Sequence, residues 1–518
     1  MSPAALSMAN EQHRRMALLP ARLELSGSWL LALPECVPAR MASVASKAQL
    51  HLLVEELCDR HGFGPLNCAT LRGVCELSAA QNTANLAALK QGFTDLRDLA
   101  GPSNHGTREE RWSTILNVTA QVRAQWQLGR GAPWDAGTNA SAFFAAREGR
   151  RVFLTRKGYL QHQDTALALQ EAWVDSKELD SWQTTIAKRS IDLQGARGID
   201  AAPTMYGAQG SVWFATVTKL THDAEQMAHL LLQGKLPAEL WEATSDYLSV
   251  AKAHSAQLGG GLFQLDDNDL IRLAPWLQSH LYHPPPPASP LASALSLQPS
   301  DDVRLGKITR EYHTKNMVVI DDFLSPEALK VLTEFLHEAT IFYDVRPGYL
   351  GAYVHQGLDS PVLFQAIDEL RQLFPDIIGG ERLKALWAYK IDGGDNQPAL
   401  DVHGDDALVN LNVWLNPAEE VGEEAGGGLQ VWKEAAPKSW SFEEMNKCTS
   451  ARCRAMLERS ASVTIPFRRN RLVLFKSTLF HKSVAMRGFP ATGYARRRIN
   501  LTFLFGDRSG TSKRKDEL

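Results

Sequence analysis

Several features that would assign a chain to a large class of proteins are scarce or missing in this sequence of 518 residues. No run of 18 apolar residues occurs, so the sequence predicts no membrane-spanning helix. The formal net charge is only −3, which excludes a general attraction to nucleic acid through excess positive charge. The six cysteines form no Cys-x-x-Cys pair, so zinc-finger spacing is missing and reduced, buried thiols are expected.

Length and composition allow two or three domains, because 44% hydrophobic residues over 518 positions can fill more than one core. Four consecutive prolines at 284–287, followed by Ser- and Ala-rich sequence, predict an extended spacer. We therefore divide the chain into a flexible or targeting segment (1–44), a mainly helical domain of unknown function (45–280), a proline-rich linker (281–300), a chemistry-bearing domain (301–508) and a polar tail (509–518).

The residue pattern predicts helices and strands on both sides of the linker. In the N-terminal half we expect a helical stripe at 86–96, strands at 151–155 and 211–217, and helices from 222 to 257 with Pro237 in a first turn. After the linker, Ser325-Pro326 and Ser360-Pro361 each predict a helix start. Residues 433–462 are helical and rich in charge, and are expected to form a lid.

The strongest signal for chemistry is a constellation in the last quarter of the chain: His403-Gly404-Asp405, then His481, then Arg498. Two imidazoles and one carboxylate form the facial triad that holds non-haem Fe(II) and leaves coordination positions open. On an extended strand, residues two apart point to the same face, so His403 and Asp405 can bind one ion together. On a helix they would point about 200° apart.

Two later segments alternate as strands with unlike faces. Residues 407–415 place Asn410, Asn412 and Trp414 on one face, and residues 498–505 place Arg498, Asn500 and Thr502 on one face. A guanidinium matches a carboxylate bidentately and keeps its charge, so the second strand predicts a carboxylate site.

These residues resemble the 2-oxoglutarate- and Fe(II)-dependent dioxygenases, which are built on a double-stranded β-helix (jelly-roll) barrel. The resemblance covers residues 308–508 and implies an α+β chain, in which a C-terminal barrel with supporting helices follows the mainly helical N-terminal domain. It implies that His403, Asp405 and His481 are the iron ligands and that Arg498 anchors the distal carboxylate of 2-oxoglutarate. Thr502 and Tyr389 are expected beside this co-substrate, and Asn412 and Trp414 are candidate pocket residues, although aromatic side chains on strands belong more often to the core.

Within this superfamily the chain is most similar to an uncharacterised, mainly bacterial group in which such a domain follows tetratricopeptide repeats. The shared motifs are Val319-Ile-Asp-Asp-Phe323, Trp387-Ala-Tyr389, Trp414-Leu-Asn-Pro417, Gly427-Gly-Leu429, Pro466-Phe-Arg-Arg-Asn-Arg471 and Arg497-Arg-Ile-Asn500. The N-terminal half shows no 34-residue repeat, so the tetratricopeptide part does not carry over.

The resemblance implies a hydroxylase that uses Fe(II), 2-oxoglutarate and O2, releases succinate and CO2, and is helped by ascorbate. No catalytic residue is expected beyond the metal site. The substrate is a protein side chain of prolyl type or a small metabolite, and the sequence identifies neither the substrate nor the oligomeric state. No nucleic-acid partner is expected, because Leu504 stands where the related demethylases carry a second arginine.

Two other functions stay open at the level of sequence. The barrel could bind a ligand or partner without turnover, or it could be a cupin-type metalloenzyme that uses no 2-oxoglutarate. Cupin sites usually recruit more histidines, and His313 and His355 are expected at the surface.

The last four residues, Lys515-Asp-Glu-Leu518, predict retrieval to the endoplasmic reticulum lumen. The only apolar run near the start, Trp29-Leu-Leu-Ala-Leu33, is too short and too late for a convincing signal peptide, so a cytoplasmic location is the alternative. In the lumen, Asn117 and Asn139 would be glycosylation acceptors.

Overall fold

A computed structural model describes residues 106–127, 213–255, 263–391, 402–416, 426–486 and 494–508 apart from a few single positions, with scattered residues between 133 and 144. Four expected segments lie outside the described residues: 1–44, the helical stripe at 86–96, the strand at 151–155 and the tail 509–518. No helix of the described part is long and apolar enough to cross a membrane.

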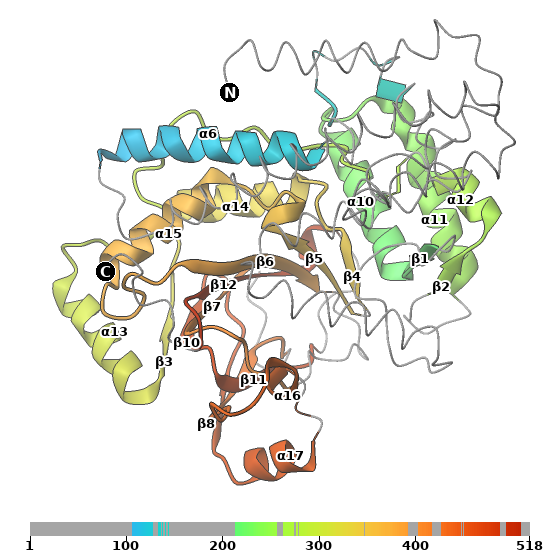
Figure 1. The fold of residues 1–518 in the computed structure, drawn as a ribbon. Helices are drawn as coiled ribbons and strands as arrows, with labels where there is room; N and C mark the ends of the chain where they lie inside the picture. Colours follow the sequence, from blue (N-terminus) through green and yellow to red (C-terminus); the bar gives the residue numbers. More distant parts are fainter. Residues whose placement is uncertain are drawn as a thin grey trace, which may run out of the picture.

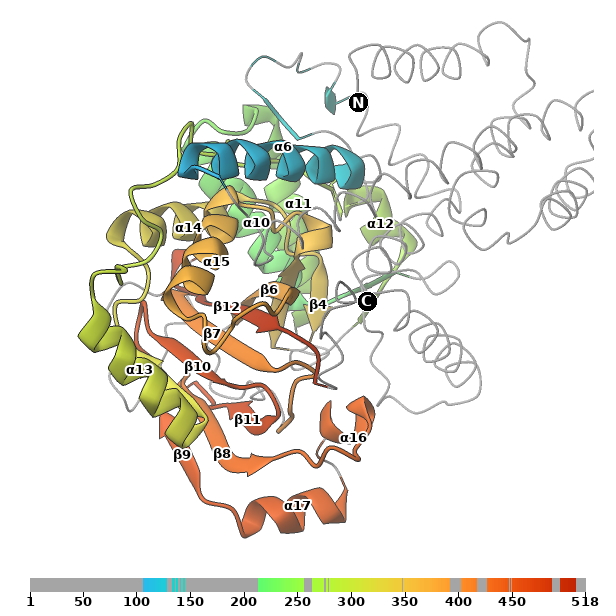
Figure 2. The same ribbon diagram turned by 60° about the vertical axis from the view of Figure 1, so that its left-hand side comes forward.

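The described part of the C-terminal domain contains two antiparallel sheets (Figures 1 and 2). The larger has the order β3-β10-β7-β12-β6-β5-β4 and the smaller the order β11-β8-β9. The larger sheet comprises β3 (Met317–Ile320), β4 (Asp344–Arg346), β5 (Tyr349–Tyr353), β6 (Leu383–Ile391), β7 (Val409–Asn416), β10 (Leu472–Lys476) and β12 (Arg498–Phe505). The smaller comprises β8 (Leu429–Ala435), β9 (Ser462–Ile465) and β11 (Leu479–Ser483).

One face of the larger sheet is covered by helices. Ile499, Leu501 and Phe503 of β12 join a core with α14 (Pro326–Glu338) and α15 (Pro361–Leu373), and α6 (Arg108–Gln127) lies over these helices (Figure 1). Both expected helix starts are confirmed. The Ser325 hydroxyl accepts a hydrogen bond from the backbone N–H of Ala328, which satisfies a free donor of the first turn. Helix α13 (Asp302–Lys315) flanks β3.

The opposite face of the larger sheet packs against the smaller sheet. Trp414, Val473 and Phe475 of the larger sheet share a buried cluster with Leu429 and Val431 of β8. Because side chains alternate along a strand, the same alternation that buries Ile499 and Leu501 under the helices turns Arg498, Asn500 and Thr502 toward the space between the sheets. This arrangement is compatible with a jelly-roll fold.

The expected insert is helical. It contains α16 (Phe442–Asn446) and α17 (Ala451–Glu458) between β8 and β9. Both helices lie at the end of the molecule that carries the smaller sheet (Figure 2).

The N-terminal unit has a separate core formed by β1 (Trp213–Ala215), α10 (Val217–Leu232), α11 (Trp241–Ser255), β2 (Phe263–Leu265) and α12 (Asp267–Leu273). The expected strand at 211–217 ends at Ala215, before the end that the pattern indicates, and α10 starts at 217 rather than 222. The reason is that Thr216 accepts a hydrogen bond from the backbone N–H of Lys219 and so caps the helix. Pro237 precedes a short 3-10 helix, Ala238–Leu240.

Helix α10 contacts the barrel through buried polar groups. The Nζ atom of Lys390 lies 3.1 Å from Nε2 of His222 and 2.9 Å from the Tyr494 hydroxyl. It also lies 4.1 Å from the ring centre of Phe342. Burial lowers the pKa of Lys390 well below its ordinary value. Arg497 forms an ion pair with Glu225 of α10, so this contact adjoins the start of β12.

The proline-rich segment differs from the expected spacer, because it is packed onto the barrel. Leu291, Leu295 and Leu297 are buried in the same hydrophobic core as residues of α14 and α15. Backbone N–H groups of Ala294 and Leu295 donate to the Glu369 carboxylate of α15, which replaces the hydrogen bonds that an extended segment lacks. The leucines between the prolines supply the apolar burial that a free spacer would not have.

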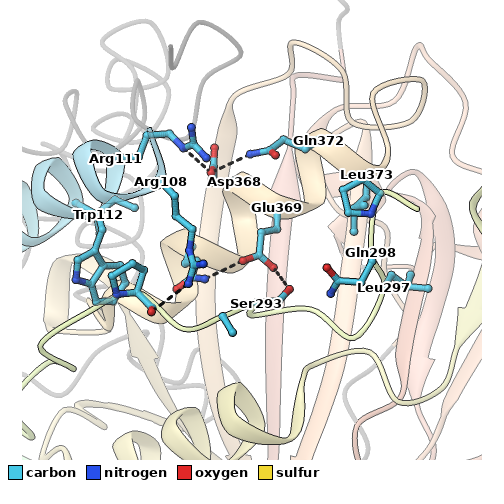
Figure 3. A pocket seen from close by; sticks show the side chains of 15 residues that line it. Arg108, Arg111, Trp112, Ser293, Leu297, Gln298, Asp368, Glu369, Gln372 and Leu373 are labelled. Carbon is cyan, nitrogen blue, oxygen red and sulfur yellow. Dashed lines mark hydrogen bonds and ion pairs between the residues drawn. The ribbon is translucent and has the colours of Figure 1, made fainter. Parts of the chain in front are cut away.

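A cavity of about 150 Å³ lies between α6, α15 and this segment (Figure 3). Its polar wall is formed largely by contacts that hold the three elements together, such as the 2.9 Å ion pair between Arg111 and Asp368. It lies over the helices, on the other side of the larger sheet from the space that Arg498 faces. We therefore attribute to it a structural role.

Candidate metal centre

The backbone brings His403 and His481 side by side although 77 residues separate them. The N–H of His403 donates to the carbonyl of His481 at 3.0 Å, and the N–H of His481 donates to the carbonyl of His403 at 2.8 Å. This isolated bridge places the two imidazole centres 4.3 Å apart. The N–H of Asp405 donates to the carbonyl of Ser477 at 3.1 Å. Ser477 lies in the turn between β10 and β11, so this bond holds Asp405 close to the strand that carries His481.

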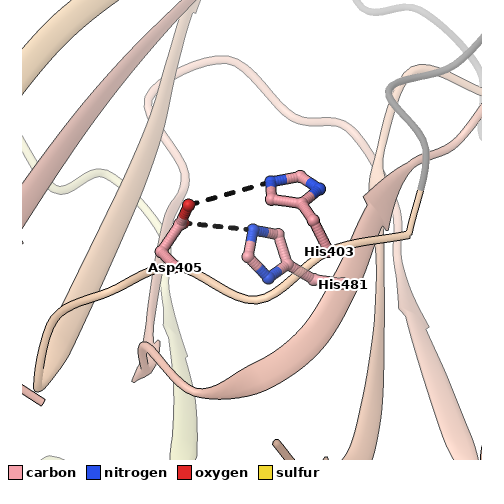
Figure 4. Close-up of side chains that lie close together, drawn as sticks. All are labelled: His403, Asp405 and His481. Atoms are coloured by element: carbon pink, nitrogen blue, oxygen red, sulfur yellow. Dashed lines mark ion pairs between the residues drawn. The ribbon is translucent and has the colours of Figure 1, made fainter. Parts of the chain in front are cut away.

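The three side chains converge as the sequence predicts (Figure 4). Nε2 of His481 lies 3.4 Å from Oδ2 of Asp405, and Nε2 of His403 lies 3.9 Å from Oδ1. One possible ligand atom from each residue lies within 4.8 Å of the others, and this is the only such group of His, Cys, Asp and Glu in the described part of the chain. Ligand atoms about 2.1 Å from one ion lie roughly 3 Å from each other at right angles, so these residues fit a single metal ion after small side-chain adjustments.

The hydrogen bond of the His481 ring favours metal binding. Its Nδ1 atom lies 3.0 Å from the carbonyl oxygen of Leu479. Because a carbonyl can only accept, Nδ1 carries the proton and donates, and Nε2 keeps a lone pair directed at the site. His481 is 4% exposed and Asp405 is 9% exposed, whereas the His403 side chain is 20% exposed, so the site is more open beside His403.

The Asp405 carboxylate remains ionised. Burial alone would raise its pKa, but His481 and His403, when protonated in the metal-free site, outweigh burial and hold the pKa below its ordinary value. Metal binding would displace the proton from Nε2 of His481 and leave the proton on Nδ1. Asn410 also donates a hydrogen bond to this carboxylate. A charged carboxylate is the form that ligates a metal ion.

The helical insert holds the segment that carries His403. The backbone N–H of Gly404 donates to the carbonyl of Met445 at 3.0 Å, and that of Cys448 donates to the carbonyl of Val402 at 3.2 Å. A Cβ atom on Gly404 would lie 2.9 Å from the Met445 side chain, so glycine is needed between the two ligands. The insert therefore contacts the metal-ligand segment directly.

The expectation of reduced cysteines is wrong for one pair, because Cys448 and Cys453 form a disulfide with a Cα–Cα distance of 5.4 Å. The first turn of α17 brings these two residues together, and Cys453 is fully buried in the insert. Disulfide pairing cannot be deduced from the spacing of cysteines alone, so the sequence pattern gave no signal for the pair. The other four cysteines lie outside the described residues.

Arg498 is a buried cation that has no anionic partner among the described residues. It is 2% exposed, and burial lowers the pKa of its guanidinium to about 9. Its Nε atom is buried and has no hydrogen-bond partner among the described residues, and no ion pair of Arg498 is found there. Its nearest aromatic contact is Trp414, with the guanidinium carbon 5.6 Å from the ring centre. Burying an unpaired charge costs free energy, and a bound anion would offset that cost. The position of Arg498 therefore favours binding of an anion.

The other candidate residues lie on the same inner face of the larger sheet. The Thr502 hydroxyl donates to Oδ1 of Asn412 at 2.9 Å. Tyr389 pairs with Asn500 across β6 and β12, and its hydroxyl lies 3.2 Å from the Tyr353 hydroxyl. Burial raises the pKa of Tyr389 well above its ordinary value. Trp414 is completely buried between the two sheets, where it contacts Phe467.

Sequence reasoning gave no role to three residues near these side chains. Asn410 hydrogen-bonds to a metal-ligand candidate, and its place on the face of Asn412 and Trp414 was a usable signal. Tyr353 and Asp344 hydrogen-bond to each other on the β4–β5 hairpin, for which the sequence predicted no strands. The expected surface position of His313 is confirmed, whereas the His355 side chain lies outside the described part.

No family model matches the chain, and no curated protein matches it. Among solved structures, the chain is similar to the non-haem α-ketoglutarate-dependent epimerase SnoN of nogalamycin biosynthesis, with 15% identity, 40% of this chain and 84% of that chain covered, and a TM-score of 0.31. It is similar to a Pseudomonas putida prolyl-4-hydroxylase, with 17% identity, coverages of 39% and 92%, and a TM-score of 0.25. A third is a 2OG-Fe(II) oxygenase family oxidoreductase from Burkholderia pseudomallei, with 9% identity, coverages of 39% and 89%, and a TM-score of 0.26. At these TM-scores the case for the site depends on its own geometry, not on the likeness.

Proposed function

We propose that this protein is an Fe(II)- and 2-oxoglutarate-dependent dioxygenase that hydroxylates a protein side chain of prolyl type or a small metabolite. The observation that carries the proposal is the combination of a partly buried His-Asp-His cluster with Arg498, a buried cation that lacks an anionic partner among the described residues. A metal-binding cluster alone would suit several chemistries. The additional buried cation specifies a ligand that carries a carboxylate.

In this proposal, Nε2 of His403, Nε2 of His481 and the Asp405 carboxylate would hold the iron. When bound, iron would supply the chemistry by which O2 oxidises both 2-oxoglutarate and the substrate, so that one oxygen atom enters succinate with release of CO2 and the other hydroxylates a C–H bond. The carbonyl of Leu479 keeps the His481 proton on Nδ1, so Nε2 is available to the metal.

Arg498 would bind the far carboxylate of 2-oxoglutarate. Its position between two packed sheets removes competing water, which strengthens a charge-assisted hydrogen bond. Thr502 and Tyr389 lie on the same inner face and would line this part of the pocket. Trp414, packed against the guanidinium, limits the directions in which Arg498 can point.

The order of the strands supports a double-stranded β-helix. From β6 onward, β6, β7, β10 and β12 belong to the larger sheet. The bridge at His403, strands β8 and β9, and β11 belong to the smaller side. In such a barrel the chain passes repeatedly between two facing sheets, and the candidate ligands lie where it crosses.

The Cys448–Cys453 disulfide supports an oxidising compartment, such as the endoplasmic reticulum lumen, as the location of the enzyme. In that compartment a prolyl-type protein substrate is the preferred version of the proposal, and ascorbate is its expected helper.

The test is an anaerobic titration of the purified chain with Fe(II) and 2-oxoglutarate, monitored by the weak visible charge-transfer band of the chelate. The expected result is a band that needs both additions and is lost in His481→Ala. The matched control is His313→Ala, which changes an exposed histidine of α13 and should leave the band intact. Absence of the band in folded, metal-loaded wild-type protein would overturn the proposal in favour of a barrel that binds without turnover.

A further inference from the structure

The buried side chains between the metal-ligand candidates and Arg498 form a continuous chain of hydrogen bonds. We propose that Asn410 and Asn412 are positioning residues that orient the Asp405 carboxylate for the metal and connect it to the strand that carries Arg498. This inference rests on the proposed function, because it assigns residues that support the same site. Neither asparagine is assigned to contact the metal or the co-substrate.

The first link is the hydrogen bond that Nδ2 of Asn410 donates to Oδ2 of Asp405, at 2.5 Å. Asn410 is completely buried, so water cannot replace this donor if the side chain is removed. Oδ1 of Asp405 receives no hydrogen bond from the described residues and lies on the side of His403. The amide therefore fixes the rotation of the carboxylate and leaves one oxygen for a metal ion.

The second link sets the orientation of the first. Nδ2 of Asn412 donates to Oδ1 of Asn410 at 2.8 Å. If the Asn410 amide were reversed, its oxygen would face the Asp405 carboxylate and its NH2 group would face the NH2 group of Asn412. Both contacts would be repulsive, so the buried pair allows only the orientation in which a donor points at Asp405.

The third link crosses from β7 to β12. Oδ1 of Asn412 accepts hydrogen bonds from Nδ2 of Asn500 at 3.0 Å and from the Thr502 hydroxyl at 2.9 Å. All donors in the chain point toward Asp405, so each hydrogen bond polarises the next in the same direction. Arg498 lies two residues from Asn500 on the same face of β12.

The far end of the chain is incomplete in the described residues. Oδ1 of Asn500 is buried without a hydrogen-bond partner, as is Nε of Arg498. Buried polar atoms are normally paired, so two unpaired atoms at neighbouring positions on one face indicate a place where bound molecules complete the hydrogen bonding. This relay of hydrogen bonds, from Asn500 through Asn412 and Asn410 to Asp405, therefore links the metal-ligand carboxylate with the position where the co-substrate is proposed to bind.

The test measures Mn(II) affinity by calorimetry without 2-oxoglutarate, so that turnover is not the readout. Asn410→Leu keeps the approximate size of the side chain and removes the donor to Asp405, and the expected loss of affinity is about 10- to 100-fold. Asn412→Leu leaves Asn410 in place but removes its orienting partner. Its affinity is expected to fall in the same direction by a smaller factor.

Asn416→Leu is the matched control. Asn416 is a buried asparagine on the same strand, but its amide lies near His337 and the backbone of Arg497 instead of Asp405. Its replacement is expected to lower the melting temperature, as all three substitutions should, while Mn(II) affinity stays within about twofold of wild type. A purely structural role of Asn410 would affect melting without this difference in affinity.

The outcomes separate the two proposals. If wild-type protein binds Mn(II) and Asn410→Leu binds it equally well, the inference is overturned and the proposed function stands. Equal losses in Asn410→Leu and Asn416→Leu would also overturn it. If wild-type protein binds no divalent metal, the proposed function fails and the inference fails with it. If Asn410→Leu does not fold, the Mn(II) affinity of Asn412→Leu tests the inference instead. Unchanged affinity in that variant would overturn the inference.

Discussion

His403 and His481 exchange two backbone hydrogen bonds, at 3.0 and 2.8 Å, and this pairing places both imidazoles on one side of the same bridge. The position of the two rings is thus set by main-chain contacts rather than by metal binding. A site built in this way is preorganised, so a metal ion need only bring the Asp405 carboxylate and the two rings slightly closer.

Replacement of Arg498 by methionine should separate stability from function. Arg498→Met removes a buried charge that has no ion-pair partner in the described part of the chain, so the metal-free protein is expected to be as stable as wild type or more stable by about 1 kcal/mol. Affinity for 2-oxoglutarate should fall by about 100-fold, because a charge-assisted pair with the carboxylate is lost. Urea unfolding and calorimetry measure the two effects. A large loss of stability would show that Arg498 has a structural partner.

Two ion pairs of helix α6 should contribute very differently to the free energy of unfolding. Arg123 donates twice to the completely buried Asp359, at 2.9 Å each, and His283 contacts the same carboxylate. Although burial would raise the pKa of Asp359, Arg123 and His283 hold it far below its ordinary value. Arg123→Ala should therefore lower the unfolding free energy by about 3 kcal/mol, because a buried carboxylate loses its main partner.

Arg111 provides the comparison on the same helix. Its partner Asp368 is 19% exposed, so Arg111→Ala should cost about 1 kcal/mol or less. Chemical denaturation of both variants measures the difference. Equal effects of the two substitutions would contradict the assignment of Asp359 as the buried charge that fastens α6.

Acidification from pH 7 to pH 5 should destabilise the contact between α10 and the barrel. Burial lowers the pKa of His337 to about 3, and the pKa values of His222 and His229 are also lowered by burial. The unfolded chain then binds more protons than the folded chain below about pH 6.5, so stability is full above that pH and falls as the pH drops. His337 alone should contribute a loss of about 2 kcal/mol over this interval.

The measurement is the urea midpoint of wild type and His337→Gln at pH 7 and pH 5. The variant should lose about 2 kcal/mol less than wild type over the interval. His313→Gln, on the exposed face of α13, should behave as wild type. An unchanged pH dependence in His337→Gln would exclude His337 as a source of acid sensitivity.

The Cys448–Cys453 disulfide should stabilise the insert only modestly, because it closes a short loop. Loop entropy predicts a loss of about 2 kcal/mol for the double replacement by alanine. Because the insert hydrogen-bonds to Val402 and Gly404, metal affinity should fall as well. Thiol trapping with mass spectrometry first establishes the linkage in the purified protein, and detection of two free thiols under non-reducing conditions would refute it.

Local sequence was enough to locate β7 and β12 and the face that each of their residues occupies. The expected strands at 407–415 and 498–505 correspond to β7 at Val409–Asn416 and β12 at Arg498–Phe505, and Arg498, Asn500 and Thr502 share a face as expected. The reason is that strand alternation has a period of two residues and depends only on neighbours in the chain. The helix starts at Ser325 and Ser360 were predictable because a proline that directly follows each serine favours the first helical position, which again depends only on neighbours in the chain.

Only the tertiary structure determined which distant residues each of these side chains contacts. The sequence by itself determined that His403, Asp405 and His481 are of the types that bind a metal, but only the bridge between His403 and His481 places them within reach of one ion. The burial of Arg498 without an anion, the relay from Asn500 to Asp405 and the packing of the proline-rich segment all depend on contacts between segments far apart in the chain. Local pattern fixes the direction of a side chain, whereas its partner and its burial are set only when distant strands and helices pack together.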